Sequence, residues 1–186
     1  MTGHDIAARV GGVPLPVAEI DAREARLRSS PQVAALPRPG TSEGRQLRRW
    51  LTQLAVSERL VEQQADVLGV AVAVTTPAEA DLLPDLTARL EIGGVAASVL
   101  ASPLARAVFT HVTADVDVDA DAAADYDRRN PGRFGSRALT ATHLRGAARR
   151  RAFRLWLDQR RAELVWLAPG YEHPGDPRQP DNTHRH

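Results

Sequence analysis

The chain has 186 residues, of which 43% are hydrophobic and 25% charged, and its formal net charge at pH 7 is +1. This balance is typical of a globular protein with one sizeable core, and it excludes a global electrostatic attraction to nucleic acid or to anionic membranes. The chain has no cysteine and all 24 of its basic residues are arginine, which excludes disulfides, thiolate catalysis, cysteine-type zinc sites and lysine Schiff-base chemistry.

The N-terminal segment carries an early acid, Asp5, and lacks an apolar stretch of signal-peptide length. No later segment approaches the run of about 20 apolar residues that a membrane-spanning helix needs. We therefore expect a cytoplasmic protein with no membrane partner.

The first elements expected along the chain are a β-hairpin and a short helix. Gly11 and Gly12 stand between two short apolar runs, as in a two-residue hairpin turn. Pro14 and Pro16 limit the second strand to a sheet edge. The residues from Val17 to about Arg28 suit a short amphipathic helix.

Two interpretations compete for residues Gly40 to Gly44, whose sequence is G-T-S-E-G. The segment matches the G-x-S-x-G elbow of serine hydrolases, in which Ser42 would be the nucleophile. That elbow requires a strand that leads directly into it, and Pro37 and Pro39 disfavour a strand there. We prefer the second interpretation, in which Thr41 or Ser42 is the N-cap of the next helix.

That next helix is the strongest prediction in the chain. Apolar residues recur every three to four positions, and Gly69 stands where a C-terminal cap belongs. The apolar positions are Leu47, Trp50, Leu51, Leu54, Val61, Ala65 and Leu68.

A third helix should begin at Thr76 and Pro77, with Glu79 closing a capping box, and should run to about Leu90. An amphipathic segment follows, and its residues on one side are Val99, Leu100, Leu104, Ala107, Val108 and His111.

Alternating aspartates then suggest a calcium loop. They are Asp115, Asp117, Asp119 and Asp121. An EF-hand loop needs glycine at its sixth position and glutamate at its twelfth, but counted from Asp117 these positions hold Ala122 and Arg128. The register from Asp115 fails in the same way. We prefer a short helix that is capped by Asp119 and ends at Asn130.

A long, arginine-rich helix is predicted from about Ala138 to Leu167. Its apolar stripe contains Phe153, Trp156, Leu157, Leu164 and Leu167. The arginine clusters on its flanks could grip phosphates, but the acidic stretch from Asp115 to Asp127 is available to neutralise them. We therefore prefer a solvated or internally paired face and do not expect nucleic acid as a partner.

Three segments and the order of the elements carry a resemblance to a known family. The segments are V-G-G-V-P-L-P-V-A-E-I-D-A-R (Val10 to Arg23), R-R-W-L-T-Q-L-A-V-S-E-R-L-V-E-Q-Q-A-D-V-L-G-V (Arg48 to Val70) and V-D-V-D-A-D-A-A-A-D-Y-D-R-R-N-P-G-R-F (Val116 to Phe134). From Val10 to about Leu167 the chain resembles the N-terminal chaperone domain of SurA-type, parvulin-linked proteins. The resemblance implies a helical chaperone-like or scaffold domain with an apolar cleft. Only Gly135 to Arg137 separate Phe134 from the last helix, so we do not expect the prolyl isomerase domain that the family carries there.

We therefore expect a mainly α, SurA-N-like domain over residues 1–168, with a short N-terminal hairpin and a long C-terminal helix. Residues 169–186 should form a tail that packs on this body or extends from it. The leading hypothesis is a chaperone-like or scaffold protein, rather than an enzyme, that binds a peptide or partner protein. The cleft residues are expected to be Trp50, Leu54, Phe153 and Trp156. Whether the chain forms a homodimer stays open.

The tail leaves alternatives open. Its histidines could bind a transition metal or haem, which would favour a small metal- or haem-dependent enzyme; these candidate ligands are His173, His184 and His186. The tail could instead pack on the body without a metal, or it could be disordered. His111 and His143 lie in amphipathic helices and are expected to be structural, with His143 a further donor if the tail folds back. A nucleic-acid-binding module on the last helix is the third hypothesis.

Overall fold

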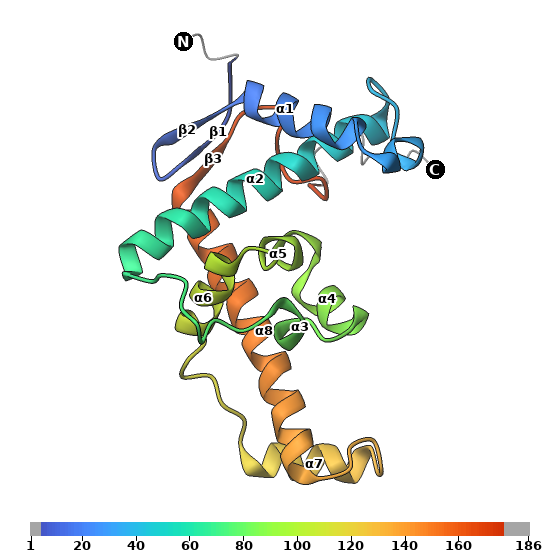
Figure 1. Cartoon of the computed structure of the whole chain (residues 1–186), viewed down its shortest axis with the longest axis vertical. Coiled ribbons are helices and arrows are strands. Elements are labelled where there is room, and N and C mark those ends of the chain that lie inside the picture. Colours follow the sequence, from blue (N-terminus) through green and yellow to red (C-terminus); the bar gives the residue numbers. More distant parts are fainter. Residues whose placement is uncertain (1–4, 177–186) are drawn as a thin grey trace. The chain divides into compact units, whose positions relative to one another are not determined.

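A computed structural model describes residues 5–176 of the chain. The N-terminal elements are β1 (Ile6–Val10), β2 (Val13–Pro16), α1 (Val17–Arg28), the 3-10 helix η2 (Pro31–Ala35) and α2 (Ser42–Leu68). They are followed by α3 (Glu79–Leu82), α4 (Leu86–Ile92), α5 (Gly94–Val99), α6 (Pro103–Val112), α7 (Ala120–Arg129), α8 (Arg137–Leu164) and β3 (Val165–Leu167) (Figure 1). The predicted fold class is confirmed, since the chain is mainly helical with a short N-terminal hairpin and a long C-terminal helix.

The chain divides into two compact units. Within the described residues, unit 1 comprises residues 5–63 and 160–176, and unit 2 comprises residues 64–159. Helices α2 and α8 each contribute residues to both units. None of the helices that the structure describes is long and apolar enough to cross a membrane.

Unit 1 contains a three-stranded antiparallel sheet with the strand order β2-β1-β3. Gly11 and Gly12 form the turn between β1 and β2 with φ angles of +54° and +83°. Residues other than glycine adopt such positive φ angles only at a cost in free energy. Strand β2, with its two prolines, lies at an edge of the sheet as predicted. The central strand β1 is almost entirely buried, with Arg9 as its one exposed residue.

Strand β3 corrects the predicted boundary of the last helix. Helix α8 ends at Leu164 rather than continuing to Leu167, and the chain pairs with β1 over the next three residues. Val165 lies opposite Val10, and the Ala168 N–H donates to the Ala7 carbonyl at 3.0 Å. The β-branched and aromatic residues of this segment favour a strand once a partner strand is present. Helical periodicity alone carries no information about a partner so far away in the sequence.

Ion pairs join α1 to α2 within unit 1. Arg23 of α1 lies 2.6 Å from Glu58 of α2, and Arg59 of α2 lies 3.1 Å from Glu19 of α1. Helix α1 buries Ile20, while α2 buries an apolar set that includes Leu51, Ala55, Val56 and Leu60. The bounds of α1 agree with the prediction, and the apolar face of α2 forms the core of this unit as expected for a spine helix.

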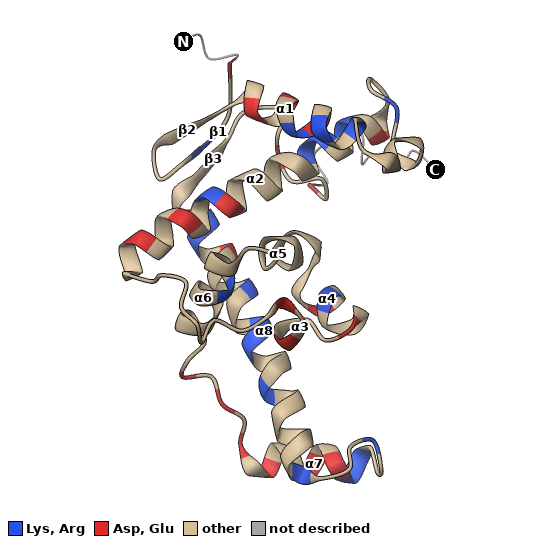
Figure 2. Cartoon of the chain, viewed as in Figure 1, with Lys and Arg blue, Asp and Glu red and all other residues tan. Residues whose placement is uncertain are grey.

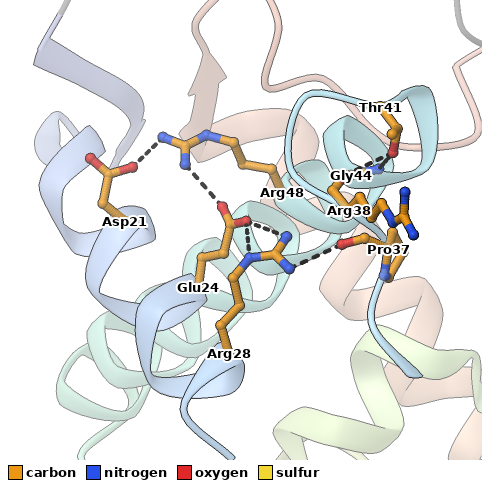
Figure 3. A network of polar contacts seen from close by, with 8 residues as sticks. All are labelled: Asp21, Glu24, Arg28, Pro37, Arg38, Thr41, Gly44 and Arg48. Atoms are coloured by element: carbon orange, nitrogen blue, oxygen red, sulfur yellow. Dashed lines mark hydrogen bonds and ion pairs between the residues drawn. The ribbon is translucent and has the colours of Figure 1, made fainter. Parts of the chain in front are cut away.

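The turn before α2 confirms the capping interpretation of the G-T-S-E-G segment. The Gly44 N–H donates to Thr41 Oγ1 at 3.0 Å, and the Thr41 hydroxyl in turn donates to the Arg38 carbonyl at 2.8 Å (Figure 3). Thr41 is therefore the N-cap, and Ser42 is the first residue of the helix rather than a residue on a strand-to-helix elbow. Gly44 is buried, and a Cβ added there would overlap the Arg38 carbonyl oxygen and lie 3.4 Å from Pro39 Cα.

Gly44→Ala is expected to lower the free energy of unfolding by about 1–3 kcal/mol, because backbone atoms of the preceding turn must move to admit the methyl group. Gly94→Ala is the matched control. Its Cβ would meet no heavy atom within 4 Å, so we expect stabilisation by about 0.4–1 kcal/mol through the unfolded state. Urea denaturation of both variants checks the pair. Equal effects of the same sign would show that the turn does not constrain position 44.

The single helix predicted from Thr76 to Leu90 is wrong, because the structure has two helices there. Helix α3 ends at Leu82, and Leu83 has non-helical φ and ψ angles of −125° and 67°. Pro84 follows and supplies no N–H for a helical hydrogen bond. Asp85 then caps α4 by accepting a hydrogen bond from the Ala88 N–H at 2.8 Å. The predicted capping box also shifts, with Asp81 rather than Glu79 accepting from the Ala78 N–H.

The core of unit 2 is built around α6 and α8. The Phe109 and Phe153 rings lie 5.2 Å apart between centroids, and both side chains are buried. Helix α7 packs on the first part of α8, where the Thr140 hydroxyl donates to Asp127 at 2.5 Å. Helix α7 runs from Ala120 to Arg129 with Asp119 as its N-cap, which confirms the predicted short helix.

Candidate functional site

The four residues of the predicted cleft belong to different units. Trp50 and Leu54 are half-buried on the unit 1 part of α2, and Phe153 and Trp156 lie on the unit 2 part of α8. Phe153 is 0% exposed, and its ring lies 5.7 Å from the half-buried ring of Trp156. Phe153 is thus a core residue of unit 2 that Trp156 partly covers. A cleft that joins the two pairs stays a prediction.

The predicted metal ligands are only partly within the described chain. His184 and His186 lie outside the described residues. His173 is exposed, and its Nδ1 accepts a hydrogen bond from the Gly175 N–H at 3.0 Å. Among residues 5–176, no group of three histidine, aspartate or glutamate side chains is placed to hold a metal ion. The three-histidine site for a transition metal or haem stays a prediction.

The first residues of the tail are hydrogen-bonded to α2 within unit 1. Arg49 donates from Nε to the Gly170 carbonyl at 3.3 Å, and Gln53 donates from Nε2 to the Tyr171 carbonyl at 3.0 Å. Arg49 is 5% exposed and Gln53 is 0% exposed. Arg161 of α8 donates to Gln53 Oε1, so both ends of this buried amide are used. The beginning of the tail, at Gly170 and Tyr171, is therefore attached to α2 by hydrogen bonds from buried side chains.

Arg48 adds a second contact to the tail. Its guanidinium carbon lies 5.9 Å from the centroid of the Tyr171 ring, within cation–π distance. Burial by itself would lower the pKa of Arg48, but side-chain hydrogen bonds with Tyr171 and Asp21 raise the pKa above its ordinary value. Arg48 thus stays charged and links the tail to α1 and α2.

Figure 3 shows the polar network between α1, α2 and the turn that precedes α2. Glu24 accepts from Arg28 Nε at 2.8 Å and from Arg48 Nη1 at 3.1 Å. Arg28 also donates to the Pro37 carbonyl at 3.0 Å. Each carboxylate in this network is paired with an arginine, so the network fixes helices and a turn and presents no free base for proton transfer.

The acidic run that suggested calcium is used in capping and ion pairs. Asp117 accepts from the Val118 N–H and from Arg145 Nε, each at 2.8 Å. The backbone hydrogen bond and then the arginine hold the pKa of Asp117 below its ordinary value. Asp125 pairs with Arg128 and Arg129, and the Asp119 side chain caps α7. These contacts support the preferred helical interpretation of the run.

The two helical histidines have different surroundings. The His143 ring lies 4.7 Å from Phe134 and 6.1 Å from Tyr126, measured between ring centroids. His143 is therefore part of an aromatic cluster that joins α7 to α8. His111 is exposed at the end of α6, where it lines a shallow cavity of about 310 Å³ together with several residues between Gly69 and Thr76.

A surface that the sequence pattern did not single out lies on α4. Leu86 and Leu90 are 70% and 72% exposed, and they lie one helical turn apart on the same face. The opposite face of α4 buries Ala88 and Ile92. Leu86 also lines a concavity of about 620 Å³, whose other lining residues are Glu79, Ala80, Leu83, Pro84, Asp85 and Arg89. We call the two leucines and this concavity the α4 surface.

Residues 6–43 match a family of unknown function (DUF7158). The matched segment holds the hairpin, α1, the 3-10 helix and the capping turn of α2. No curated protein and no solved structure matches the chain.

Proposed function

We propose that the chain is a chaperone-like or scaffold domain that binds a peptide or partner protein through an apolar surface. The resemblance to SurA-type N-terminal domains supports this class of function. The single observation that carries the proposal is the exposed pair of leucines on α4. Large apolar side chains that gather beside a concavity mark contact surfaces more often than isolated exposed residues do.

The α4 surface has the chemistry that an apolar peptide segment needs. Leu83, Pro84 and Leu86 contribute apolar side chains to the lining of the concavity. Glu79 and Arg89 line the same concavity and form an ion pair at 2.7 Å, which leaves polar groups at the rim for the backbone of a bound peptide. A bulky apolar side chain of a client would be covered by Leu86 and Leu90, while the rim would face solvent.

A direct test is the binding of a fluorescently labelled, unfolded apolar peptide, measured by anisotropy. Burial of one leucine stabilises a contact by roughly 1.5–3 kcal/mol, so Leu86→Ser with Leu90→Ser should raise the Kd about tenfold or more. Leu139→Ser is the matched control, since Leu139 is an exposed leucine on α8 of the same unit. Circular dichroism checks that all proteins stay folded.

The same assay tests the predicted cleft through Trp50→Ala and Trp156→Ala, made singly because the residues belong to different units. If the leucine variant binds as wild type does, the α4 surface is not the binding site. If wild type binds no unfolded peptide, the proposed function fails.

A further inference from the structure

A second groove in unit 2 lies between α4 and α8. It has a volume of about 440 Å³ and is lined by Glu91, Ala147, Ala148, Arg151 and Arg154. The two alanines contribute only methyl groups, so the part of the groove between the charged residues is apolar. Arg151 and Arg154 are three residues apart on α8, which places them on adjacent positions of the helix surface.

The arginines of this groove differ from their neighbours on α8, along which arginines recur (Figure 2). Arg149 donates to Thr113 Oγ1 at 2.9 Å, and the buried Arg150 pairs with Glu91 at 2.8 Å. Arg151 and Arg154 are exposed and make no hydrogen bond or ion pair with any residue from 5 to 176. Two adjacent guanidinium groups are therefore available to a ligand.

The net charge of the groove is positive. Its one acid, Glu91, accepts from both Nε and Nη2 of Arg150, at 3.2 Å and 2.8 Å. That pairing neutralises the carboxylate, and nothing comparable neutralises Arg151 or Arg154 among the described residues. Carboxylate oxygens match the forked donors of guanidinium groups, which bind them through two parallel hydrogen bonds.

The surroundings favour an acidic peptide over nucleic acid. A phosphate backbone needs a row of cations, whereas the described residues of the groove offer only the two guanidinium groups of Arg151 and Arg154. In addition, the exposed acid Asp158 lies one turn after Arg154. Leu155, which is 53% exposed, lies one turn after Arg151. Methyl groups and a leucine beside paired guanidiniums suit a segment in which an acidic residue stands next to an apolar one.

We propose that this groove docks an acidic segment of the partner, with a carboxylate on Arg151 and Arg154 and a neighbouring apolar side chain over Ala147 and Ala148. The inference rests on the proposed function, because it names the chemistry of the partner that a binding domain of this kind takes. The groove adds a preference for acidic partners, which the apolar side chains of the α4 surface alone do not supply.

The test uses three labelled peptides of equal length and apolar content that carry two central glutamates, glutamines or arginines. Wild type should bind the glutamate peptide roughly tenfold more tightly than the glutamine peptide at low salt, with a preference that weakens as salt rises. Arg151→Glu with Arg154→Glu should reverse the preference in favour of the arginine peptide. Arg26→Glu with Arg137→Glu changes the net charge equally at two exposed positions outside the groove, and it should keep the wild-type preference.

Three outcomes overturn the inference. If wild type binds the glutamine peptide as tightly as the glutamate peptide, the groove does not select acidic partners, while the proposed function stands. If the control variant loses the preference as the groove variant does, the effect belongs to net charge. If a single-stranded oligonucleotide displaces the glutamate peptide at lower concentration than the unlabelled peptide does, the groove binds nucleic acid. Should the charge-reversed protein not fold, Arg151→Gln with Arg154→Gln must abolish the preference instead.

Discussion

Phe153→Ala is expected to destabilise unit 2 by about 3–5 kcal/mol, the range for removal of a buried aromatic ring. The side chain is 0% exposed, and its ring contacts the rings of Phe109 and Trp156 at centroid distances of 5.2 Å and 5.7 Å. Alanine would leave a cavity between α6 and α8 and would remove both ring contacts. Because a folded domain is stabilised by about 5–15 kcal/mol, a loss of this size should unfold a large fraction of the protein in mild denaturant.

Urea denaturation followed by far-ultraviolet circular dichroism measures this effect. Leu155→Ala is the matched control, since Leu155 lies two positions away on the same helix and is 53% exposed. We expect the control to change the free energy of unfolding by no more than about 0.5 kcal/mol. If the two variants unfold at the same urea concentration, Phe153 is not a core residue, and its predicted place on an open cleft would gain support.

Gln53→Leu should lower the stability of unit 1 by about 2–3 kcal/mol, because a charged donor and a backbone acceptor lose their buried partner. The amide of Gln53 accepts from Arg161 and donates to the Tyr171 carbonyl at 3.0 Å. Leucine has a similar volume and makes neither bond. The attachment of the tail to α2 should therefore weaken, whereas the hydrogen bond from Arg149 to Thr113 in unit 2 should be unaffected.

Two readouts check the Gln53 prediction. The free energy of unfolding gives its size, and limited proteolysis after Tyr171 reports release of the tail. Gln63→Leu is the control, since Gln63 also donates to a backbone carbonyl, that of Val10, at 2.9 Å, but is only half-buried. The control should cost about 0.5–1.5 kcal/mol and leave the tail protected. Equal cleavage of both variants would show that Gln53 does not hold the tail.

Local signals predicted most of the helices and the hairpin. The bounds of α1, the turn at Gly11 and Gly12, and the caps at Thr41 and Asp119 all follow from residues within a few positions of each element. Each of these features depends on backbone angles or hydrogen bonds that neighbouring residues supply, so a single sequence contains the necessary information.

The misplaced boundaries have a different cause. Pro84 cannot donate a helical hydrogen bond, so the helix expected from Thr76 to Leu90 is interrupted between Leu82 and Leu86. At Val165 the competing partner was β1, which is remote in sequence. Strand formation there depends on a pairing that no local window contains.

The candidate surfaces were harder to predict than the fold. An apolar stripe on a helix does not tell a core side chain from a cleft side chain, and Phe153 illustrates the difference. Leu86 and Leu90 are exposed because α4 buries its opposite face through Ala88 and Ile92, a choice of face that depends on the rest of unit 2. Glu91, which belongs to another helix, pairs with Arg150 and not with Arg151. The sequence of α8 alone therefore does not tell which of these two arginines is available to a ligand. Arg49 and Gln53 donate to backbone carbonyls of the tail. Every residue has such a carbonyl, so the sequence of the tail does not indicate these hydrogen bonds.

The most direct test of the account is the anisotropy titration of an unfolded apolar peptide with wild type and with the Leu86→Ser, Leu90→Ser protein. We expect saturable binding by wild type and a Kd at least about tenfold higher for the variant, with unchanged helicity in both. Equal affinity of the two proteins, or no binding by wild type, would contradict it.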